Sequence, residues 1–182
     1  MPRAAERDVR PRAEIPHGSG DDRRACRLRL EPMRLHHVSE IAALEKKVFA
    51  DPWSADSFLS EVGRRPDVGW PIVVRDATEI VAYAVVWFIV DEIHIGNIAV
   101  RPERHGQGIG RWLMEHILEE GRKRSMVFAT LEVRPSNSAA IKLYEGFGFR
   151  KIAVRRRYYR NNDEDAWVLA IALDPSAEDR LG

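Results

Sequence analysis

Apolar residues recur along this chain at two spacings, one typical of helices and one typical of strands. Between residues 37 and 49 the apolar positions fall three and four residues apart, as on one face of a helix: Val38, Ile41, Leu44, Val48 and Phe49. Ser39 is of the residue type that caps a helix start. The pattern predicts a helix here and a shorter one over residues 55–63, after the break at Asp51–Ser54.

The middle of the chain has the pattern of strands. After a short strand that begins near Leu28, three apolar runs predict strands over residues 70–75, 79–89 and 92–100. Their connections are short, and the last one is a tight turn around Asp91. Because short connections join antiparallel neighbours, we expect an antiparallel meander.

Beyond this meander, helices alternate with strands. The predicted elements are a helix over 109–123 opened by a glycine-rich loop, a strand over 127–133, a helix within 137–149 stopped by Gly148, and strands over 150–157 and 165–173. A strand–helix–strand crossover after a meander predicts an α/β fold. The central sheet should be mixed and mostly antiparallel, with helices on both faces.

Length and charge restrict the classes of protein that fit. The 182 residues suffice for one domain with a buried core. Residues 1–26 combine proline, glycine and mixed charge with little apolar spacing, so we expect a disordered N-terminal tail, a domain over 27–174 and a C-terminal tail over 175–182. The formal net charge of +1 gives no overall field that would draw the chain to nucleic acid or to a membrane.

Cysteine usage and hydropathy narrow the choice further. The single cysteine, Cys26, excludes a disulfide scaffold and a cysteine-based zinc site, and we expect no bound metal. No apolar signal-peptide core precedes the domain, and the most apolar run, Ile80–Val90, has about half of the roughly 20 residues that a membrane helix needs. We therefore expect a cytoplasmic protein without a membrane partner.

Three glycines, Gly106, Gly108 and Gly110, separate the last meander strand from the following helix. Each costs roughly 0.5–1 kcal/mol relative to alanine, so we expect positions that need positive φ or close approach. Free amides at a helix N-terminus bind anions, and missing side chains let a pyrophosphate reach the backbone. A dinucleotide fingerprint fails at Arg111, and a P-loop would need Gly-Lys-Ser/Thr. A glycine loop without a ligand is the alternative.

The loop sequence His105-Gly106-Gln107-Gly108-Ile109-Gly110 resembles the acyl-CoA loop of the GCN5-related N-acetyltransferase (GNAT) superfamily, whose pattern is Q/R-x-x-G-x-G/A. His105 departs from the glutamine or arginine of that pattern, which affects one side-chain contact. The segment LEVRPSNSAAIKLYEGFGF, Leu131–Phe149, is similar to the corresponding segment of the bacterial ribosomal-protein-alanine N-acetyltransferases.

Shorter stretches of the chain extend this similarity. They are Pro52–Ser54, Asn97–Val100, Arg155–Tyr159 and Glu164–Ala166. The resemblance covers residues 28–173 in order. It implies the GNAT fold, in which a splayed pair of parallel strands holds acyl-CoA.

The resemblance also implies which residues bind acetyl-CoA, the expected co-substrate. The main-chain groups of Ile98, Ala99 and Val100 would hold the pantetheine arm. Residues of the glycine loop would hold the pyrophosphate: Gly106, Gln107, Gly108, Ile109, Gly110 and Arg111. Asn137 matches an asparagine that contacts CoA in the family. It also stands where a helix cap belongs, so a plain capping role stays open.

Glu132 is the candidate general base. It shares a strand face with Phe128 and Thr130, and an unpaired carboxylate on a covered strand would be costly, so it should line the site or have a partner. The resemblance implies that Glu132 accepts the proton directly or through water; a strand-end salt bridge is the alternative. Tyr144 matches the family's proton donor to the leaving thiolate, and a core tyrosine is the alternative.

The resemblance implies acetyl transfer by direct attack of a protein α-amine, with the N-terminal alanine of a small-subunit ribosomal protein as the expected substrate. Neutralising an α-amine of pKa about 8 at pH 7 costs roughly 1.4 kcal/mol, against about 4–5 kcal/mol for a lysine. Trp53, Tyr158 and Tyr159 are expected to border the peptide. His94, which alternates with apolar residues on a strand, is expected to be structural.

Two other functions stay open. An acetyltransferase of the same fold could act on another protein N-terminus or on a small-molecule amine. Alternatively, the basic and aromatic run Arg155–Arg160 could hold RNA in a protein without acetyltransferase activity, which predicts steeply salt-dependent binding. The presence of Glu132, Asn137 and Tyr144 argues against this second alternative, so nucleic acid is not the expected partner.

Overall fold

The computed structural model describes residues 28–181. The predicted N-terminal tail, with Cys26, lies outside the described residues. Seven strands form one sheet: β1 (Leu28–Pro32), β2 (Ile72–Asp76), β3 (Glu79–Ile89), β4 (Glu92–Val100), β5 (Phe128–Val133), β6 (Arg150–Tyr159) and β7 (Glu164–Ala172). Their order in the sheet is β1-β2-β3-β4-β5-β7-β6, and every neighbouring pair is antiparallel except β4 and β5. The predicted α/β fold with a mixed, mostly antiparallel sheet is confirmed.

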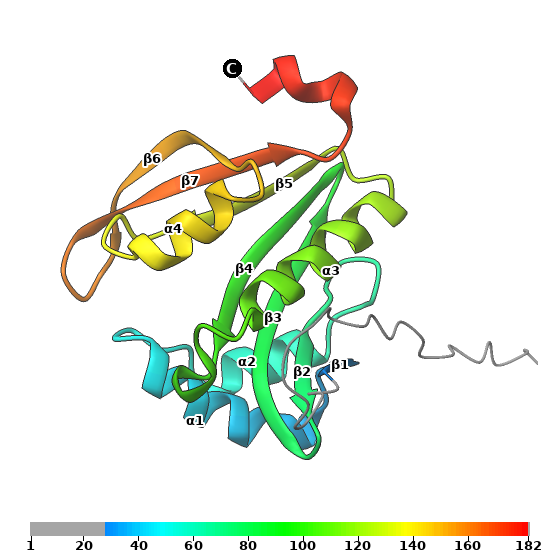
Figure 1. The fold of residues 1–182 in the computed structure, drawn as a ribbon. Helices are drawn as coiled ribbons and strands as arrows, with labels where there is room; N and C mark the ends of the chain where they lie inside the picture. The colour runs from blue at the N-terminus through cyan, green and yellow to red at the C-terminus, as the bar shows by residue number, and fades with distance from the viewer. Residues whose placement is uncertain (1–27, 182) are drawn as a thin grey trace, which may run out of the picture.

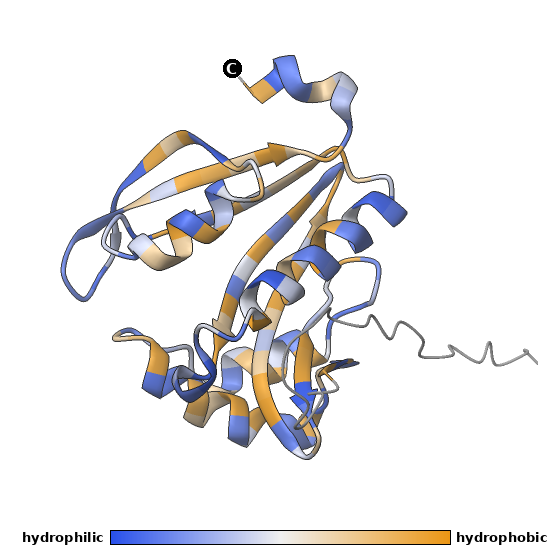
Figure 2. Ribbon diagram, viewed as in Figure 1, coloured by the Kyte–Doolittle hydropathy of each residue, from blue (hydrophilic) through white to orange (hydrophobic). Residues whose placement is uncertain are grey.

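Helices cover both faces of the sheet, as the pattern predicted. The helices are α1 (Val38–Val48), α2 (Ala55–Val62), α3 (Ile109–Lys123) and α4 (Ser138–Glu145), with 3-10 turns η1 (Leu35–His37), η2 (Pro102–Arg104) and η3 (Pro175–Leu181). One buried cluster joins α1 and α2 to the sheet, and a second joins α3 and α4 to its other face. Figure 2 shows the matching pattern, with apolar residues along β3 and polar residues on the outer side of α3.

One predicted detail of the helix ends is wrong and one is confirmed. Ser39 does not cap α1, because the turn η1 precedes the helix and His37 occupies the N-cap without a side-chain hydrogen bond. The helix predicted within residues 137–149 runs to Glu145. Gly148, with a φ of 94°, stops it as predicted, because the Gly148 amide donates to the Glu145 carbonyl at 2.9 Å and the Phe149 amide donates to the Tyr144 carbonyl at 3.1 Å, the two bonds of a Schellman turn.

The sheet opens between β4 and β5. The two strands pair only where Glu92–Ile95 lies beside Phe128–Leu131. Beyond this point they diverge, which Figure 1 shows as the widening angle between the two strand ribbons. On its other side β4 continues to pair with β3 as far as Val100. The edge of β4 that faces β5 therefore has no strand partner over Gly96–Val100.

The C-terminal residues pack against the domain. In η3, Ala177 is buried, Glu178 pairs with Arg150 at 2.8 Å and Arg180 pairs with Asp91 at 3.5 Å. The segment predicted as a C-terminal tail is thus part of the folded structure as far as Leu181. Among the described residues, no helix combines the length and the hydropathy that crossing a bilayer would require.

Candidate active site

The loop before α3 leaves a row of amide groups without partners. Gly106 and Gly108 have φ angles of 75° and 77°, so the predicted positive φ is confirmed at both. Within the described residues, no amide of 106–111 donates a hydrogen bond, and the first helical bond runs from the Trp112 amide to the Gly108 carbonyl at 2.9 Å. A Cβ added at either glycine would meet no atom within 4 Å. The amides are open on that side and can bind an anion.

Side chains of the same loop hold its backbone in place. Gln107 Oε1 accepts a hydrogen bond from Arg104 Nε at 3.0 Å, and Arg104 pairs with Asp76 at 2.5 Å. His105 Nε2 lies 2.9 Å from the Val100 carbonyl oxygen, on the edge of β4 that β5 leaves unpaired. These contacts fasten the loop to β2 and β4, so its exposed amides are held without a ligand. His105, which departs from the expected loop pattern, thus holds the loop to the end of β4.

Glu132 is the first residue of β5 beyond the last pair with β4. Its side chain is only 11% exposed, and its Oε1 accepts a hydrogen bond from the Arg155 guanidinium at 2.7 Å. Oε2 lies 3.2 Å from His94 Nε2. When His94 is protonated, its hydrogen bond to Glu132, and then that from Arg155, hold the pKa of the Glu132 carboxyl below its usual value, although burial acts in the opposite direction. The predicted partner therefore exists, and it forms the salt bridge that was the alternative role of Glu132; the carboxylate is ionised at neutral pH.

His94 is the site residue that sequence reasoning missed. Its ring lies on Trp87, with centroids 5.6 Å apart and planes 2° from parallel, and its Nδ1 faces Thr130 Oγ1 at 2.8 Å. Burial lowers the pKa of His94, but the carboxylates of Glu132 and Glu92 outweigh burial and raise it above its usual value. The sequence did offer a signal, because His94 is a polar residue between the buried Ile93 and Ile95 on a strand. One sequence could not show that Glu132 and Glu92 lie beside its ring.

Tyr144 lies on the opposite face of β5 from Glu132. Leu131 and Val133, which flank Glu132, belong to the same buried cluster as Tyr144, and alternate residues of a strand point to opposite faces. The ring is 6% exposed, and burial raises the pKa of its hydroxyl above the usual value. Within the described residues the hydroxyl has no hydrogen bond, and no fully buried side-chain polar atom lacks a partner. Tyr144 is thus packed as in the alternative of a core tyrosine, and its hydroxyl retains some contact with solvent.

Comparisons with known proteins agree with this geometry. Residues 35–149 match the model of the acetyltransferase (GNAT) family. The chain belongs to the GNAT family. It is 39% identical over 132 residues to the ribosomal protein bS18-alanine N-acetyltransferase of Escherichia coli K12, covering 71% of this chain and 87% of that protein. It is 35% identical over 136 residues to the N-alpha-acetyltransferase RimI of Mycobacterium tuberculosis, covering 70% and 82%.

A solved structure supports the same relationship. The crystal structure of the ribosomal-protein-S18-alanine N-acetyltransferase from Escherichia coli matches with a TM-score of 0.73 and 32% identity, covering 81% of this chain and 94% of that one. The chain is therefore a GNAT N-acetyltransferase, and the family implies acetyl-CoA as its co-substrate. In the GNAT fold of this chain, the open edge of β4 and the glycine loop lie side by side.

In this GNAT chain, Asn137 caps α4. Its Oδ1 accepts a hydrogen bond from the Ala140 amide at 3.2 Å, which confirms the capping role. The neighbouring loop is fastened to the β6–β7 hairpin through Glu164, which accepts hydrogen bonds from the Ser136 amide at 3.0 Å and from Arg134 at 3.1 Å. These bonds, those from Ser136 first, lower the pKa of Glu164 to about 2.

Trp53 is held where the loop after α1 meets the sheet. Its ring stacks on Trp87 with centroids 6.2 Å apart, and its amide donates to Glu45 Oε1 at 2.9 Å. Glu45 is 1% exposed and also accepts hydrogen bonds from Asn97 and from the Tyr83 hydroxyl. Sequence reasoning did not single out Glu45, although an acidic residue on the apolar stripe of α1 was a usable signal. This buried carboxylate connects α1, β3, β4 and the loop of Trp53.

The strand β6 brings its aromatic and basic residues toward Glu132. The pairing of β6 with β7 is irregular between Arg155 and Tyr159, and such a bulge re-aims side chains. Arg155 reaches Glu132 and lies 4.6 Å from the Tyr158 ring centroid, and Arg156 pairs with Asp165 at 2.9 Å. Arg155 and Arg156, two arginines of the run considered for the alternative of RNA binding, are thus paired with carboxylates of the same molecule, which weakens that alternative.

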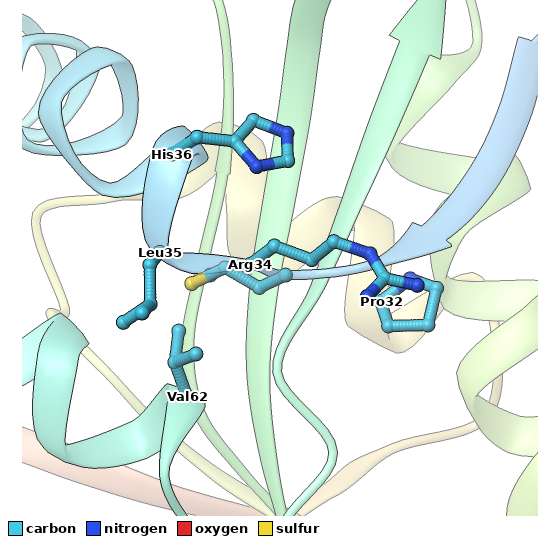
Figure 3. Close-up of a pocket in the computed structure, with 6 residues that line it drawn as sticks. Pro32, Arg34, Leu35, His36 and Val62 are labelled. Carbon is cyan, nitrogen blue, oxygen red and sulfur yellow. The ribbon is translucent and has the colours of Figure 1, made fainter.

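A surface pocket of about 430 Å³ lies elsewhere in the molecule. It is lined by Pro32, Met33, Arg34, Leu35, His36 and Val62. Figure 3 shows Leu35 and Val62 on the same side of this pocket, at the junction of β1, η1 and the end of α2. None of the predicted site residues lines it, so the pocket is separate from the splayed strands.

Proposed function

We propose that this chain transfers an acetyl group from acetyl-CoA to the N-terminal α-amine of a protein, the N-terminal alanine of ribosomal protein bS18. The proposal is supported by relatives from Escherichia coli and Salmonella typhimurium, 39% and 37% identical over 132 residues, whose names state this activity. The observation that carries the chemistry is the position of Glu132, at the first place where β5 leaves β4.

The free amides of residues 106–111 would hold the pyrophosphate of acetyl-CoA. From there the open edge of β4, with Ile98, Ala99 and Val100, leads toward Glu132 and can take up the pantetheine arm as a further strand would. The capping oxygen of Asn137 is occupied, so its amide nitrogen is the group that would contact CoA. This route ends with the thioester at the opening of the sheet.

At that opening the thioester would lie beside β5, where residues from both faces of the sheet can reach it. The neutral α-amine attacks the thioester carbon, and Glu132 accepts the proton that the nitrogen loses. As the carbon–sulfur bond breaks, the thiolate takes a proton from the Tyr144 hydroxyl. That hydroxyl is protonated at neutral pH, and burial, which raises its pKa, makes its proton transfer to the thiolate less favourable than transfer from an exposed tyrosine. The amine would enter between Trp53 and the pair Tyr158 and Tyr159.

Acetylation of synthetic peptides tests the proposal. The purified chain is incubated with acetyl-CoA and a peptide of the bS18 N-terminus, and mass spectrometry locates the acetyl group. Matched controls are the same peptide with a blocked α-amine, a peptide with a different first residue, and spermidine. Acetylation of the free alanine α-amine alone supports the proposal, whereas preference for another N-terminus or for spermidine contradicts the bS18 assignment.

A further inference from the structure

The two ring nitrogens of His94 face three polar groups in the sheet. Its Nε2 lies 3.2 Å from Glu132 Oε2. On the other side of the ring, Nδ1 lies 2.8 Å from Thr130 Oγ1 and 3.5 Å from Glu92 Oε1. Trp87 covers one ring face and holds the imidazole in plane with these partners. Both nitrogens therefore have fixed partners of known hydrogen-bonding capacity.

Counting protons in this group determines the tautomer. The Thr130 hydroxyl has one proton, and it donates that proton to the Glu92 carboxylate. Its oxygen can then only accept from His94, so Nδ1 carries a hydrogen. A neutral imidazole in this tautomer presents the lone pair of Nε2 to a carboxylate oxygen of Glu132. Two acceptors face each other, and one added proton turns their repulsion into a hydrogen bond.

We propose that the base of this site is the His94–Glu132 pair, which shares the one proton released by the attacking amine, and that His94 is the positioning residue that holds this proton behind Glu132. The inference rests on the proposed function and deepens it. The nitrogen–hydrogen bond of the amine breaks, the proton passes to Glu132 and is shared with Nε2, and it leaves to solvent after the product departs. Tyr144 separately protonates the thiolate and recovers its own proton from solvent.

The charged groups around the ring favour this arrangement. Glu92 faces His94 from its own strand and Glu132 faces it from β5, while Arg155 of β6 contacts the other oxygen of Glu132. Behind Trp87, Arg64, which follows α2, is paired with Glu61 of that helix at 2.6 Å. The two carboxylates beside the ring raise the pKa of His94 against the effect of burial. The proton is therefore stabilised on the pair.

Glu132 alone would hold the proton poorly. A carboxyl at the ordinary pKa of 4.5 is protonated in only about one molecule in three hundred at pH 7, and the pKa of Glu132 is lower still. Because the pKa of the His94 imidazole is raised, it lies closer to the pKa of an α-amine than the pKa of the carboxyl does. Sharing the proton with His94 thus lets Glu132 act as a base without having to remain protonated itself.

Nitrogen NMR of His94 in the protein without substrates tests the proton arrangement directly. We expect Nδ1 to stay protonated throughout the titration, Nε2 to titrate with a pKa above 6.5, and this pKa to fall in Glu132→Gln. Thr130→Val should release the preference for the Nδ1 tautomer. A neutral imidazole protonated at Nε2, or a titration that Glu132→Gln leaves unmoved, would overturn the inference. This measurement needs no peptide, so it is decided separately from the proposed substrate.

The pH profile of kcat tests the role in catalysis. With one peptide throughout, His94→Gln should lower kcat at pH 7 by about 10- to 100-fold, leave the KM for acetyl-CoA within about twofold, and shift the acidic limb of the profile to lower pH. Glutamine keeps a hydrogen bond to Glu132 but cannot hold the proton. Replacement of the exposed His36 by Gln is the matched control and should change nothing. A loss that is equal at every pH would show a merely structural role and contradict the inference.

Discussion

At the scale of single residues, glycine meets two different needs in this chain. Gly106 and Gly108 adopt positive φ with open space beside them, so they are required for backbone shape and for access to the amides. Gly96 serves close approach instead, because a Cβ there would lie 2.5 Å from the Trp87 ring. The absent side chain lets Trp87 cover β4 and stack on His94. One glycine thus determines how the proposed base is held.

Gly108→Val should weaken acetyl-CoA binding at least tenfold. The valine must adopt a left-handed φ, which costs roughly 1–2 kcal/mol, and its side chain stands on the open side of the loop where the pyrophosphate would approach. Calorimetric titration with acetyl-CoA measures the effect. Gly63→Ala is the matched control, since a Cβ at that helix end meets only backbone oxygens at 3.8 Å. Unchanged affinity in Gly108→Val would remove this loop from the binding site.

Glu132→Gln should lower kcat by about 100- to 10,000-fold and leave the affinity for acetyl-CoA within about twofold. The amide cannot accept a proton, but it fills the same space next to His94 and Arg155. Steady-state acetylation and calorimetry separate the two quantities. Glu119→Gln, on the exposed face of α3, is the control. Wild-type turnover in Glu132→Gln would exclude this carboxylate from the mechanism.

At the scale of elements, the β6–β7 hairpin is fastened to the loop between β5 and α4. Arg134 donates to Glu164 at 3.1 Å and to Asn161 at 2.9 Å, and its guanidinium lies 3.5 Å from the Tyr159 ring centroid. Because Arg155 and Tyr158 belong to this hairpin, its position determines where Arg155, with the Tyr158 ring beside it, meets Glu132. The hairpin is therefore part of the proposed peptide site although its residues are mostly exposed.

Arg134→Gln should raise the KM for the peptide several-fold and leave acetyl-CoA affinity unchanged. The shorter side chain loses the paired contact to Glu164 and the contact with the Tyr159 ring, so the hairpin becomes more mobile. Hydrogen exchange of the hairpin amides and peptide kinetics provide the measurements. Arg65→Gln, which breaks an exposed surface pair with Asp67, should alter neither quantity. Equal loss of affinity for peptide and acetyl-CoA would contradict the assigned role.

At the scale of the molecule, two buried clusters on opposite faces of one sheet surround the opening between β4 and β5. The fully buried Glu45 is bonded across one of them, to the loop of Trp53, to Asn97 and to Tyr83. His37, buried on the same face, has its pKa lowered mainly by burial. Ionisable groups inside the fold therefore link its stability to pH.

The stability that His94 contributes should decline above pH 6.5. Because the folded state raises the pKa of His94, its contribution is fully present below the unfolded value of 6.5 and is lost as the pH rises through the folded pKa. The difference in unfolding free energy between wild type and His94→Gln should shrink as the pH rises above 6.5, measured by urea denaturation. The contribution of His37 to stability has the opposite sign. Because burial lowers its pKa in the folded state, His37 reduces stability only as the pH falls below the unfolded value of 6.5, outside this window. A constant difference would contradict the raised pKa.

The sequence by itself determined the order and type of the elements, because apolar spacing reports which faces are buried. It gave the bounds of β3, β4 and α3 as the structure has them. It also located the positive φ of Gly106 and Gly108, a local property of the backbone. Only tertiary structure brought His94 and Arg155 onto Glu132 and put Tyr144 on the other face of β5, because these residues meet through sheet register and a bulge between distant strands. Contacts across a sheet leave no periodic signal in one sequence.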